Sequence, residues 1–297
     1  MEQPSRMRVL ILGGSGMLGH KLWQTCRSRF DTWVTVRGRC AEYAHYGMFD
    51  PERLLDEVDV FDFETVARSF QRVRPEAVVN CVGVIKQLPA ASDPLVSIPV
   101  NSLFPHRLVT LSRSVGARLI HLSTDCVFSG REGMRVEDDV PDPTDLYGRS
   151  KCLGEVIGPN CLTLRTSMIG RELSSRNGLL EWFLSRREGA VSGYKRAIYT
   201  GLTTVALSRV IADVLERHPA LDGLYHVAAT PISKYDLLCG IREAFNTQVD
   251  LRADNQVVLD RSLDGGRFQK VTGFQPPPWP EMIQELVADP TAYGWAH

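Results

Sequence analysis

The sequence is poor in the features that mark secreted, metal-binding and membrane-spanning proteins. Its seven cysteines are odd in number and scattered, and no two are spaced as Cys-x-x-Cys. This arrangement argues against a disulfide framework or a zinc site, and it is typical of free thiols in a reducing compartment. No apolar run approaches the ~20 residues of a transmembrane helix. The first apolar run of the chain stops at Gly13 and Gly14. We therefore expect a cytoplasmic protein that binds no metal and contacts no membrane.

An excess of charge of either sign is also missing. The formal net charge is -1, and 23% of the residues are charged, so no overall field draws the chain towards nucleic acid or an anionic membrane. Hydrophobic residues make up 43% of the 297 positions, which is enough for a substantial core in one large domain or two closely joined ones. The sequence does not determine the oligomeric state, and a homodimer is one possibility.

The first half of the chain alternates short β-branched runs with longer amphipathic segments. The short runs are almost continuously apolar, which is typical of parallel strands covered on both faces. We predict strands at 9–12, 33–36, 77–82, 119–122 and 162–164, and helices at about 16–29, 63–73, 100–115 and 146–157. This alternation predicts an α/β fold with a Rossmann-type doubly wound parallel sheet.

The second half is less regular. We predict helices near 178–187, 204–217, 233–245 and 279–288, one further strand at 224–227, and loops that include the region around Gly189 and Gly193. No segment is long enough to be a linker between independent domains. We expect a dinucleotide-binding domain over 7–168, to which 200–228 return, and a smaller α/β substrate-binding lobe over 169–199 and 229–297.

A glycine-rich turn follows the first predicted strand and opens the first predicted helix. In Gly-x-x-Gly-x-x-Gly, Gly13 permits a tight turn, Gly16 lets a pyrophosphate approach the backbone, and Gly19 lets helix and sheet lie close together. Within a βαβ unit this pattern predicts a dinucleotide site, and a merely structural turn is the alternative. The predicted cofactor contacts here are Gly13, Ser15, Gly16, Met17, Leu18 and Gly19.

The second predicted strand ends in Arg37-Gly38-Arg39 and lacks the carboxylate that binds an adenosine ribose in many dinucleotide sites. A carboxylate repels a 2′-phosphate, whereas a guanidinium binds it through paired hydrogen bonds. Arg37 therefore indicates NADP(H), with a solvated surface arginine as the alternative.

Tyr147 and Lys151 lie four residues apart, on one face of a predicted helix. Reduction of a ketone needs a proton for the developing alkoxide, and a free tyrosine with a pKa of about 10 gives one up reluctantly. We expect the Lys151 ammonium to lower the pKa of Tyr147. Thr124, at the end of a buried strand, is the hydroxyl expected to orient the carbonyl, and Ser123 is the next candidate.

Together, the glycine turn, Ser123-Thr124-Asp125-Cys126-Val127-Phe128, and Tyr147-x-x-x-Lys151 resemble the extended short-chain dehydrogenase/reductase family, closest to its dTDP-4-dehydrorhamnose reductase branch. The resemblance extends through 164–167, 223–227, 262–264 and 273–279, essentially the whole chain. It implies catalytic roles for Thr124, Tyr147 and Lys151. Tyr147 and Lys151 are also expected to contact the cofactor. It further implies cofactor contacts at Asp59, Val60, Cys81, Val82 and Gly83, and it places Asn101 in a helix below the site, where a helix-surface amide is the alternative.

The sugar end departs from this branch. The rhamnose reductases carry a tyrosine where this chain has Cys126 and a tryptophan where it has Met168, and the loop containing Lys86 also differs. The expected substrate-binding residues are Lys86, Thr124, Asp125, Cys126 and Met168, although Lys86 can equally be a solvated lysine.

The resemblance implies NADPH-dependent reduction of a keto group on a nucleoside-diphosphate 6-deoxy-4-keto sugar, in the synthesis of polysaccharide precursors. Two alternatives remain. The regulatory subunit of methionine adenosyltransferase has this fold and similar motifs but acts by docking to an enzyme. In the related GDP-fucose synthases, a cysteine at the position of Cys126 serves in epimerisation, but their partner histidine has no match near Asn177 and Gly178.

Overall fold

Alternate residues of the first strand face two different layers of helices. In the computed structural model, which describes residues 6–186 and 189–293, Val9 and Ile11 pack in one hydrophobic cluster, and Leu10 and Leu12 pack in another. Helices α1 (Gly19–Cys26) and α8 (Thr204–Arg217) contribute to the first cluster, and α3 (Phe63–Val73) and α5 (Phe104–Ser114) contribute to the second. A strand buried on both faces needs apolar residues at every position, which explains its continuous apolar run.

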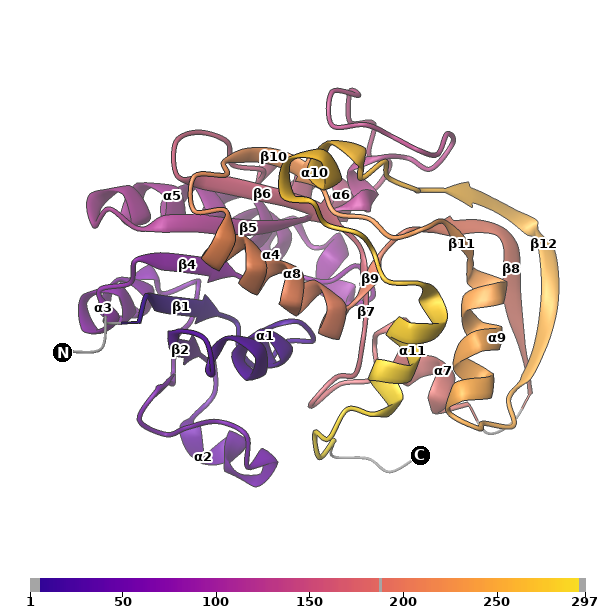
Figure 1. Cartoon of the computed structure of the whole chain (residues 1–297), viewed down its shortest axis with the longest axis horizontal. Helices are drawn as coiled ribbons and strands as arrows, with labels where there is room; N and C mark the ends of the chain where they lie inside the picture. Colours follow the sequence, from indigo (N-terminus) through magenta and orange to yellow (C-terminus); the bar gives the residue numbers. More distant parts are fainter. Residues whose placement is uncertain (1–5, 187–188, 294–297) are drawn as a thin grey trace.

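The main sheet has seven parallel strands in the order β10-β6-β5-β4-β1-β2-β3 (Figure 1). The strands are β1 (Arg8–Leu12), β2 (Asp31–Thr35), β3 (Leu54–Leu55), β4 (Ala77–Asn80), β5 (Arg118–Thr124), β6 (Cys161–Thr166) and β10 (Gly223–His226). The order reverses direction at β1 and β4, the switch point at whose carboxyl side doubly wound sheets bind ligands. The predicted α/β doubly wound fold is confirmed.

Short helical segments follow the carboxyl ends of the central strands. They are α2 (Cys40–Tyr43), η1 (Ala44–Tyr46), η2 (Pro89–Ser92), α4 (Pro94–Ser97), the π-helix η3 (Ile98–Leu103), η4 (Asp125–Val127) and α6 (Leu146–Leu153). Of these, α6 carries Tyr147 and Lys151, and η4 directly follows Thr124 at the end of β5.

A second, smaller sheet lies apart from the main one, at the right of Figure 1. In it, β8 (Ala190–Tyr199) pairs in parallel with β12 (Asp250–Asp260) and antiparallel with β11 (Ile232–Ser233). Helix α9 (Lys234–Ala244) packs closely on this sheet, because a Cβ at Gly193 in β8 would lie 2.6 Å from the ring of Tyr235. The remaining elements are β7 (Met168–Ile169), α7 (Leu179–Leu184), β9 (Leu202–Thr203), α10 (Gly266–Thr272) and α11 (Trp279–Val287).

The predicted strands and the helices at 63–73 and 204–217 are confirmed, but several boundaries differ. Helix α1 begins at Gly19 rather than residue 16, and α6 ends at Leu153 rather than residue 157. The predicted helix 178–187 spans Leu179–Leu184, and residue 187 lies outside the described ranges. The expected loop around Gly189 and Gly193 is wrong, because β8 begins at Ala190 and contains Gly193.

The proposed division into two lobes stays a prediction. The small sheet and α9 form a unit beside the main sheet, whereas α10 lies against β10, where the rings of Phe268 and Tyr225 are 6.1 Å apart. None of the helices in the described ranges is long and apolar enough to cross a membrane.

Candidate active site

The glycine turn has the geometry of a backbone cradle. Gly13 has a φ of +86°, and a Cβ on Gly19 would lie 2.1 Å from the Gly13 carbonyl oxygen. Gly14 donates its backbone N–H to Thr35 O at 2.7 Å, which ties the turn to the end of β2. Among the described residues, a Cβ on Gly16 would meet only the Gly13 carbonyl within 4 Å, so none of them fills the other side of the turn. These features fit the close approach of a pyrophosphate to the start of α1.

The other predicted cofactor contacts lie along the same carboxyl edge. Arg37 is exposed two residues beyond Thr35, whose hydroxyl accepts a hydrogen bond from Gly13 N at 3.2 Å. Val60 and Val82 pack in one cluster with the ring of Tyr147. The structure therefore brings the ends of β2, β4 and α6, and the loop after β3, to one edge of the sheet.

Asp59 and the loop after β4 complete this edge. Asp59 accepts a hydrogen bond from Phe61 N at 2.9 Å through its carboxylate, which fixes the loop before α3. Burial raises the pKa of the half-buried Cys81 thiol to about 12. Next to it, a Cβ on Gly83 would lie 3.9 Å from Lys151 Nζ.

Strand β5 carries Thr124 and Asp125 into the site. Thr124 donates its hydroxyl to Asp125 Oδ1 at 3.1 Å and accepts from Cys126 N at 3.1 Å, which caps η4. Ser123 donates to Glu155 Oε1 at 2.6 Å, and the same carboxylate forms a buried ion pair with Arg165. Because Ser123 is engaged below the site, Thr124 is the hydroxyl that faces Tyr147.

Helix α6 begins at the N-cap Asp145, which accepts from Gly148 N at 2.8 Å and so places Tyr147 in the first turn. The Thr124 hydroxyl lies close enough to Tyr147 to affect the pKa of its phenol. One turn later, Lys151 is 6% exposed and donates to Leu122 O at 2.6 Å. Burial lowers the pKa of Lys151 to about 8, and the Glu155 carboxylate opposes this shift.

The expected lowering of the Tyr147 pKa is wrong for the protein described here. Burial raises the pKa of Tyr147, the nearby Cys126 thiol raises it further, and the hydrogen bond with Thr124 opposes the rise. The ammonium of Lys151 is turned instead to the carbonyl of Leu122. At neutral pH the phenol therefore keeps its proton, which is the form that can donate to an alkoxide.

Asn101 is a buried amide rather than a surface one. It is 1% exposed, accepts from Val84 N at 2.9 Å, and donates to Ser150 Oγ at 3.2 Å. It lies in the π-helix η3, a form often found beside functional sites. Asn101 therefore holds the loop after β4 against the helix that carries Tyr147 and Lys151.

Three cationic side chains from distant segments lie near Cys126, and only one of them, Lys86, was expected from the sequence to bind substrate. Lys86 forms an ion pair with Asp145 at 2.6 Å, so it is neither free nor simply solvated. Arg261 donates through Nη1 to Cys126 Sγ at 3.5 Å. Lys234 is close enough to Asp125 and Cys126 for their charges to counter the lowering of its pKa by burial.

Arg261 directly precedes residues 262–264, a segment that resembles the family, but nothing in that segment indicates a contact between Arg261 and Cys126. Lys234 lines a pocket of about 370 Å³ beside the smaller sheet, together with Trp182 and Tyr194. Met168 is half-buried and packs against the main hydrophobic cluster. Within 6–186 and 189–293, no three His, Cys, Asp or Glu side chains are grouped to hold a metal ion, and all seven cysteines are free.

The family model of the RmlD substrate binding domain matches residues 7–291. The chain belongs to this family. The resemblance to the extended short-chain dehydrogenase/reductases, and to their dTDP-4-dehydrorhamnose reductase branch, is thereby confirmed.

Three similar proteins illustrate the range of the family. The zebrafish (Danio rerio) methionine adenosyltransferase 2 subunit beta is 30% identical over 254 residues, which cover 80% of this chain and 74% of the relative. A dTDP-4-dehydrorhamnose reductase of Streptomyces griseus is 34% identical over 156 residues, 52% of this chain and 46% of the relative. The solved dTDP-4-dehydrorhamnose reductase of Bacillus anthracis in complex with NADP has a TM-score of 0.76 at 22% identity and covers 95% of this chain and 99% of its own.

Proposed function

We propose that this protein is an NADPH-dependent reductase of a keto group on a nucleoside-diphosphate 6-deoxy-4-keto sugar, and that it supplies a polysaccharide precursor in the cytoplasm. The observation that carries the proposal is the meeting of three groups at one edge of the sheet. Thr124 lies close enough to Tyr147 to affect its pKa, and Lys151 lies one helical turn from Tyr147. Both lie on the edge at which the glycine turn opens.

The cofactor assignment rests on the turn and on the end of β2. The turn is shaped by glycines whose Cβ atoms would collide with its own backbone, which leaves peptide N–H groups to bind a pyrophosphate. Arg37 is exposed beside this turn, where its guanidinium can bind a 2′-phosphate. A solved relative of the same fold contains NADP. The proposed cofactor contacts are Gly13, Ser15, Gly16, Met17, Leu18, Gly19, Arg37, Asp59, Val60, Cys81, Val82, Gly83, Tyr147 and Lys151.

In the proposed reaction the bound nicotinamide supplies a hydride, and the protein handles the proton. Thr124 donates a hydrogen bond to the substrate carbonyl and orients it. Tyr147 transfers its phenolic proton to the oxygen as the ketone becomes an alcohol. The Lys151 ammonium, which is retained below its pKa of about 8, then stabilises the phenolate that is left.

The substrate assignment rests on the smaller lobe. The pocket of about 370 Å³ combines the aromatic rings of Trp182 and Tyr194 with the cation of Lys234. A ring system binds a nucleoside base, and cations bind a diphosphate. The Asp125 carboxylate opposes the lowering of the Lys234 pKa by burial, so the two groups lie close together. We therefore propose that the pocket continues towards Thr124. The residues proposed to lie around the sugar are Lys86, Asp125, Cys126 and Met168.

The test is oxidation of NADPH by the purified protein, followed through the loss of NADPH absorbance, against a panel of nucleotide-linked 4-keto sugars. Tyr147→Phe is expected to lower turnover by about 10²–10⁴-fold while NADPH still binds, because only the proton donor is lost. The matched control is Tyr225→Phe, at a ring that packs against Phe268 of α10 with 6.1 Å between ring centres, and it should retain activity. Full turnover by Tyr147→Phe would contradict the mechanism.

The similarity to methionine adenosyltransferase 2 subunit beta favours one alternative, a non-catalytic dinucleotide-binding subunit of another enzyme. A protein of this kind would bind NADPH, oxidise none of it with any keto sugar, and co-purify with a partner enzyme in a stoichiometric complex. That result would replace the reductase assignment.

A further inference from the structure

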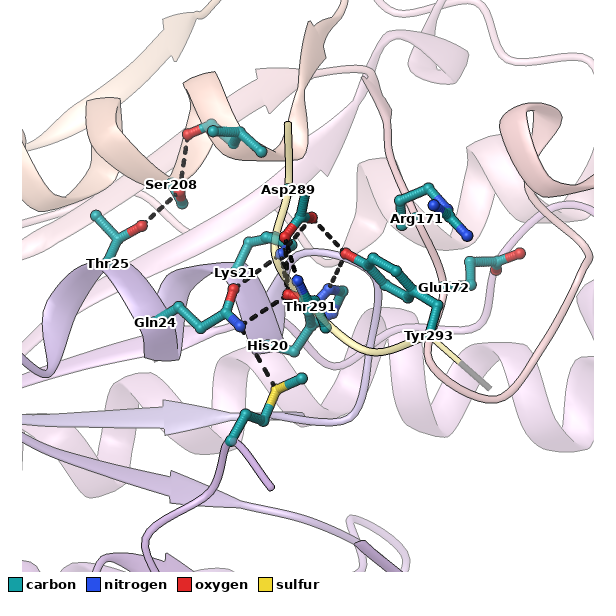
Figure 2. A network of polar contacts seen from close by, with 12 residues as sticks. His20, Lys21, Gln24, Thr25, Arg171, Glu172, Ser208, Asp289, Thr291 and Tyr293 are labelled. Carbon is teal, nitrogen blue, oxygen red and sulfur yellow. Dashed lines mark hydrogen bonds and ion pairs between the residues drawn. The ribbon is translucent and has the colours of Figure 1, made fainter. Parts of the chain in front are cut away.

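The last described segment of the chain returns to the helix that follows the glycine turn. After α11, residues 289–293 pass across α1, where Asp289, Thr291 and Tyr293 point towards His20 and Lys21 (Figure 2). We call residues 289–293 the C-terminal strap. It joins the far end of the sequence to the segment proposed to bind the dinucleotide.

A buried ion pair anchors the strap. Lys21 Nζ lies 2.5 Å from Asp289 Oδ2, and the two side chains are only 5% and 3% exposed. Lys21 also donates to Thr291 Oγ1 at 2.8 Å and to Gln24 Oε1 at 2.8 Å. Since removal of one partner would leave a buried charge unpaired, this contact holds the strap firmly on α1.

From this anchor, a chain of hydrogen bonds leads into the glycine turn. Tyr293 donates its hydroxyl to Asp289 Oδ2 at 2.5 Å, and the Tyr293 hydroxyl oxygen lies 3.2 Å from His20 Nε2. His20 Nδ1 lies 2.8 Å from the carbonyl oxygen of Gly16. Because a carbonyl only accepts, Nδ1 carries the proton, and Nε2 of the neutral ring accepts from the Tyr293 hydroxyl, which it shares with Asp289.

The ring of Tyr293 connects the turn to the loop after β7. The guanidinium of Arg171 lies 4.2 Å from the centre of the ring. Later in the same loop, a Cβ on Gly178 would lie 2.7 Å from Met17 Cε, so this loop abuts the glycine turn directly. Tyr293 therefore packs between two segments that both border the turn.

We infer that His20 and Tyr293 are positioning residues that fix the Gly16 carbonyl and the first turn of α1 in the geometry that receives the cofactor pyrophosphate. The inference rests on the proposed function, because it needs a dinucleotide at this turn. Neither residue touches Thr124 or Tyr147 through any of these contacts. The strap should therefore control the affinity for the dinucleotide and leave the chemical step unchanged.

The test compares Tyr293→Phe with Thr25→Val in the full-length protein. Tyr293→Phe keeps the ring beside Arg171 and removes only the hydroxyl that takes part in the chain of hydrogen bonds. Thr25→Val removes the 2.8 Å hydrogen bond between Thr25 and Ser208, which ties the same helix to α8 without reaching the turn (Figure 2). Loss of one buried hydrogen bond changes an equilibrium by about three- to tenfold.

We expect Tyr293→Phe to raise the Kd for NADPH by about three- to tenfold, with kcat at saturating NADPH within about twofold of wild type. Amide hydrogen exchange of residues 13–20 in the free protein should become faster. His20→Gln should behave alike, and the double variant should lose little more than either single variant, because both break one chain. Thr25→Val should change neither readout.

Two results would overturn the inference. One is an unchanged Kd and unchanged exchange at residues 13–20 in Tyr293→Phe. The other is an equal effect of Thr25→Val, which would mean that α1 responds to any loss of packing. If the wild-type protein binds no dinucleotide, the proposed function fails. In that case, unchanged hydrogen exchange at residues 13–20 in Tyr293→Phe would refute the positioning role of Tyr293. Faster exchange would support that role, with another ligand at the turn.

Discussion

The cofactor edge of the sheet and the surroundings of Cys126 are built in different ways. At the cofactor edge, the key groups lie close together in sequence: Gly13 to Gly19 in one turn, and Tyr147 with Lys151 in one helix. Around Cys126, by contrast, the cations of Lys86, Lys234 and Arg261 come from three distant segments.

The difference suggests that the two regions do separate tasks. Hydride and proton transfer need a fixed geometry, which local sequence can specify through one turn and one helix. The choice of substrate depends on side chains that line the pocket, and these can change without disturbing the turn or the helix. Variants at the cofactor edge should therefore change turnover or cofactor affinity, and variants around Cys126 should change the KM for the sugar.

The largest expected effect is that of Lys151→Met, which removes the cation one helical turn from Tyr147 and keeps an apolar chain of similar length. We expect turnover to fall by about 10²–10⁴-fold. Because burial lowers the pKa of Lys151 to about 8, its charge is present below that pH and is lost above it. In the wild type, kcat/KM for reduction should therefore decline as the pH rises through about 8, as measured in initial-rate profiles.

The control for this variant is Lys270→Met, at an exposed position on α10. It should keep both the rate and the pH profile of the wild type. A Lys151→Met protein with a wild-type rate, or one that retains the same alkaline decline, would mean that another group titrates and that the cofactor edge works differently.

A smaller effect is expected for Arg37→Ala, which tests the choice between the two dinucleotides. Hydrogen bonds to a charged group contribute about 1.5–3 kcal/mol, so affinity for NADPH should fall by about 10–100-fold. Affinity for NADH, which lacks the 2′-phosphate, should change little. Titration of both dinucleotides by intrinsic fluorescence measures the ratio, and equal losses for the two would refute the assignment.

Arg39→Ala is the comparison for Arg37→Ala. Arg39 follows the same strand, but its side chain is 78% exposed and pairs with Glu57 at 3.4 Å. We expect it to weaken NADPH binding less than Arg37→Ala does. A larger loss of NADPH affinity in Arg39→Ala would mean that Arg39, rather than Arg37, binds the 2′-phosphate.

The fold and the cofactor edge could be predicted because their determinants are local. The continuous apolar runs of β1, β4 and β5 predict strands buried on both faces, and the glycine turn follows β1 directly. The strands β8 and β12 could not be predicted in this way. Most residues of β12 are exposed, and Gly193 interrupts the pattern of β8. The determinant is instead the pairing of the two strands, in which partners such as Ala190 and Asp250 lie 60 positions apart.

The same reasoning explains which site residues the sequence did not reveal. Arg261 reaches Cys126 across 135 positions, and Tyr293 reaches His20 across 273. No spacing rule connects residues so far apart, because their contact depends on how α9, β12 and α11 pack. The raised pKa of Tyr147 has a related reason, since it follows from burial of the phenol in the folded protein, which the spacing of Tyr147 and Lys151 does not reveal.

The smallest expected effect is that of Cys126→Ser, and it decides whether the surroundings of Cys126 take part in chemistry. Burial and the neighbouring Asp125 raise the pKa of the Cys126 thiol to about 12, and the nearby Arg261 opposes this shift. A thiol that is neutral at pH 7 is a poor base for removing a proton next to a ketone. We therefore expect Cys126→Ser to keep kcat within about threefold, since pocket contacts rather than proton transfer are altered.

Solvent deuterium gives the sharper readout of the same question. In D₂O, neither the wild type nor Cys126→Ser should place deuterium on the ring carbons next to the reduced carbon. Arg261→Met, which removes the charge beside the thiol at 3.5 Å, should raise the KM for the sugar and leave kcat nearly unchanged. Deuterium that appears in the wild type and disappears in Cys126→Ser would make Cys126 an acid–base group. The protein would then be an epimerase as well as a reductase, and the separation of chemistry from substrate choice would fail at this residue.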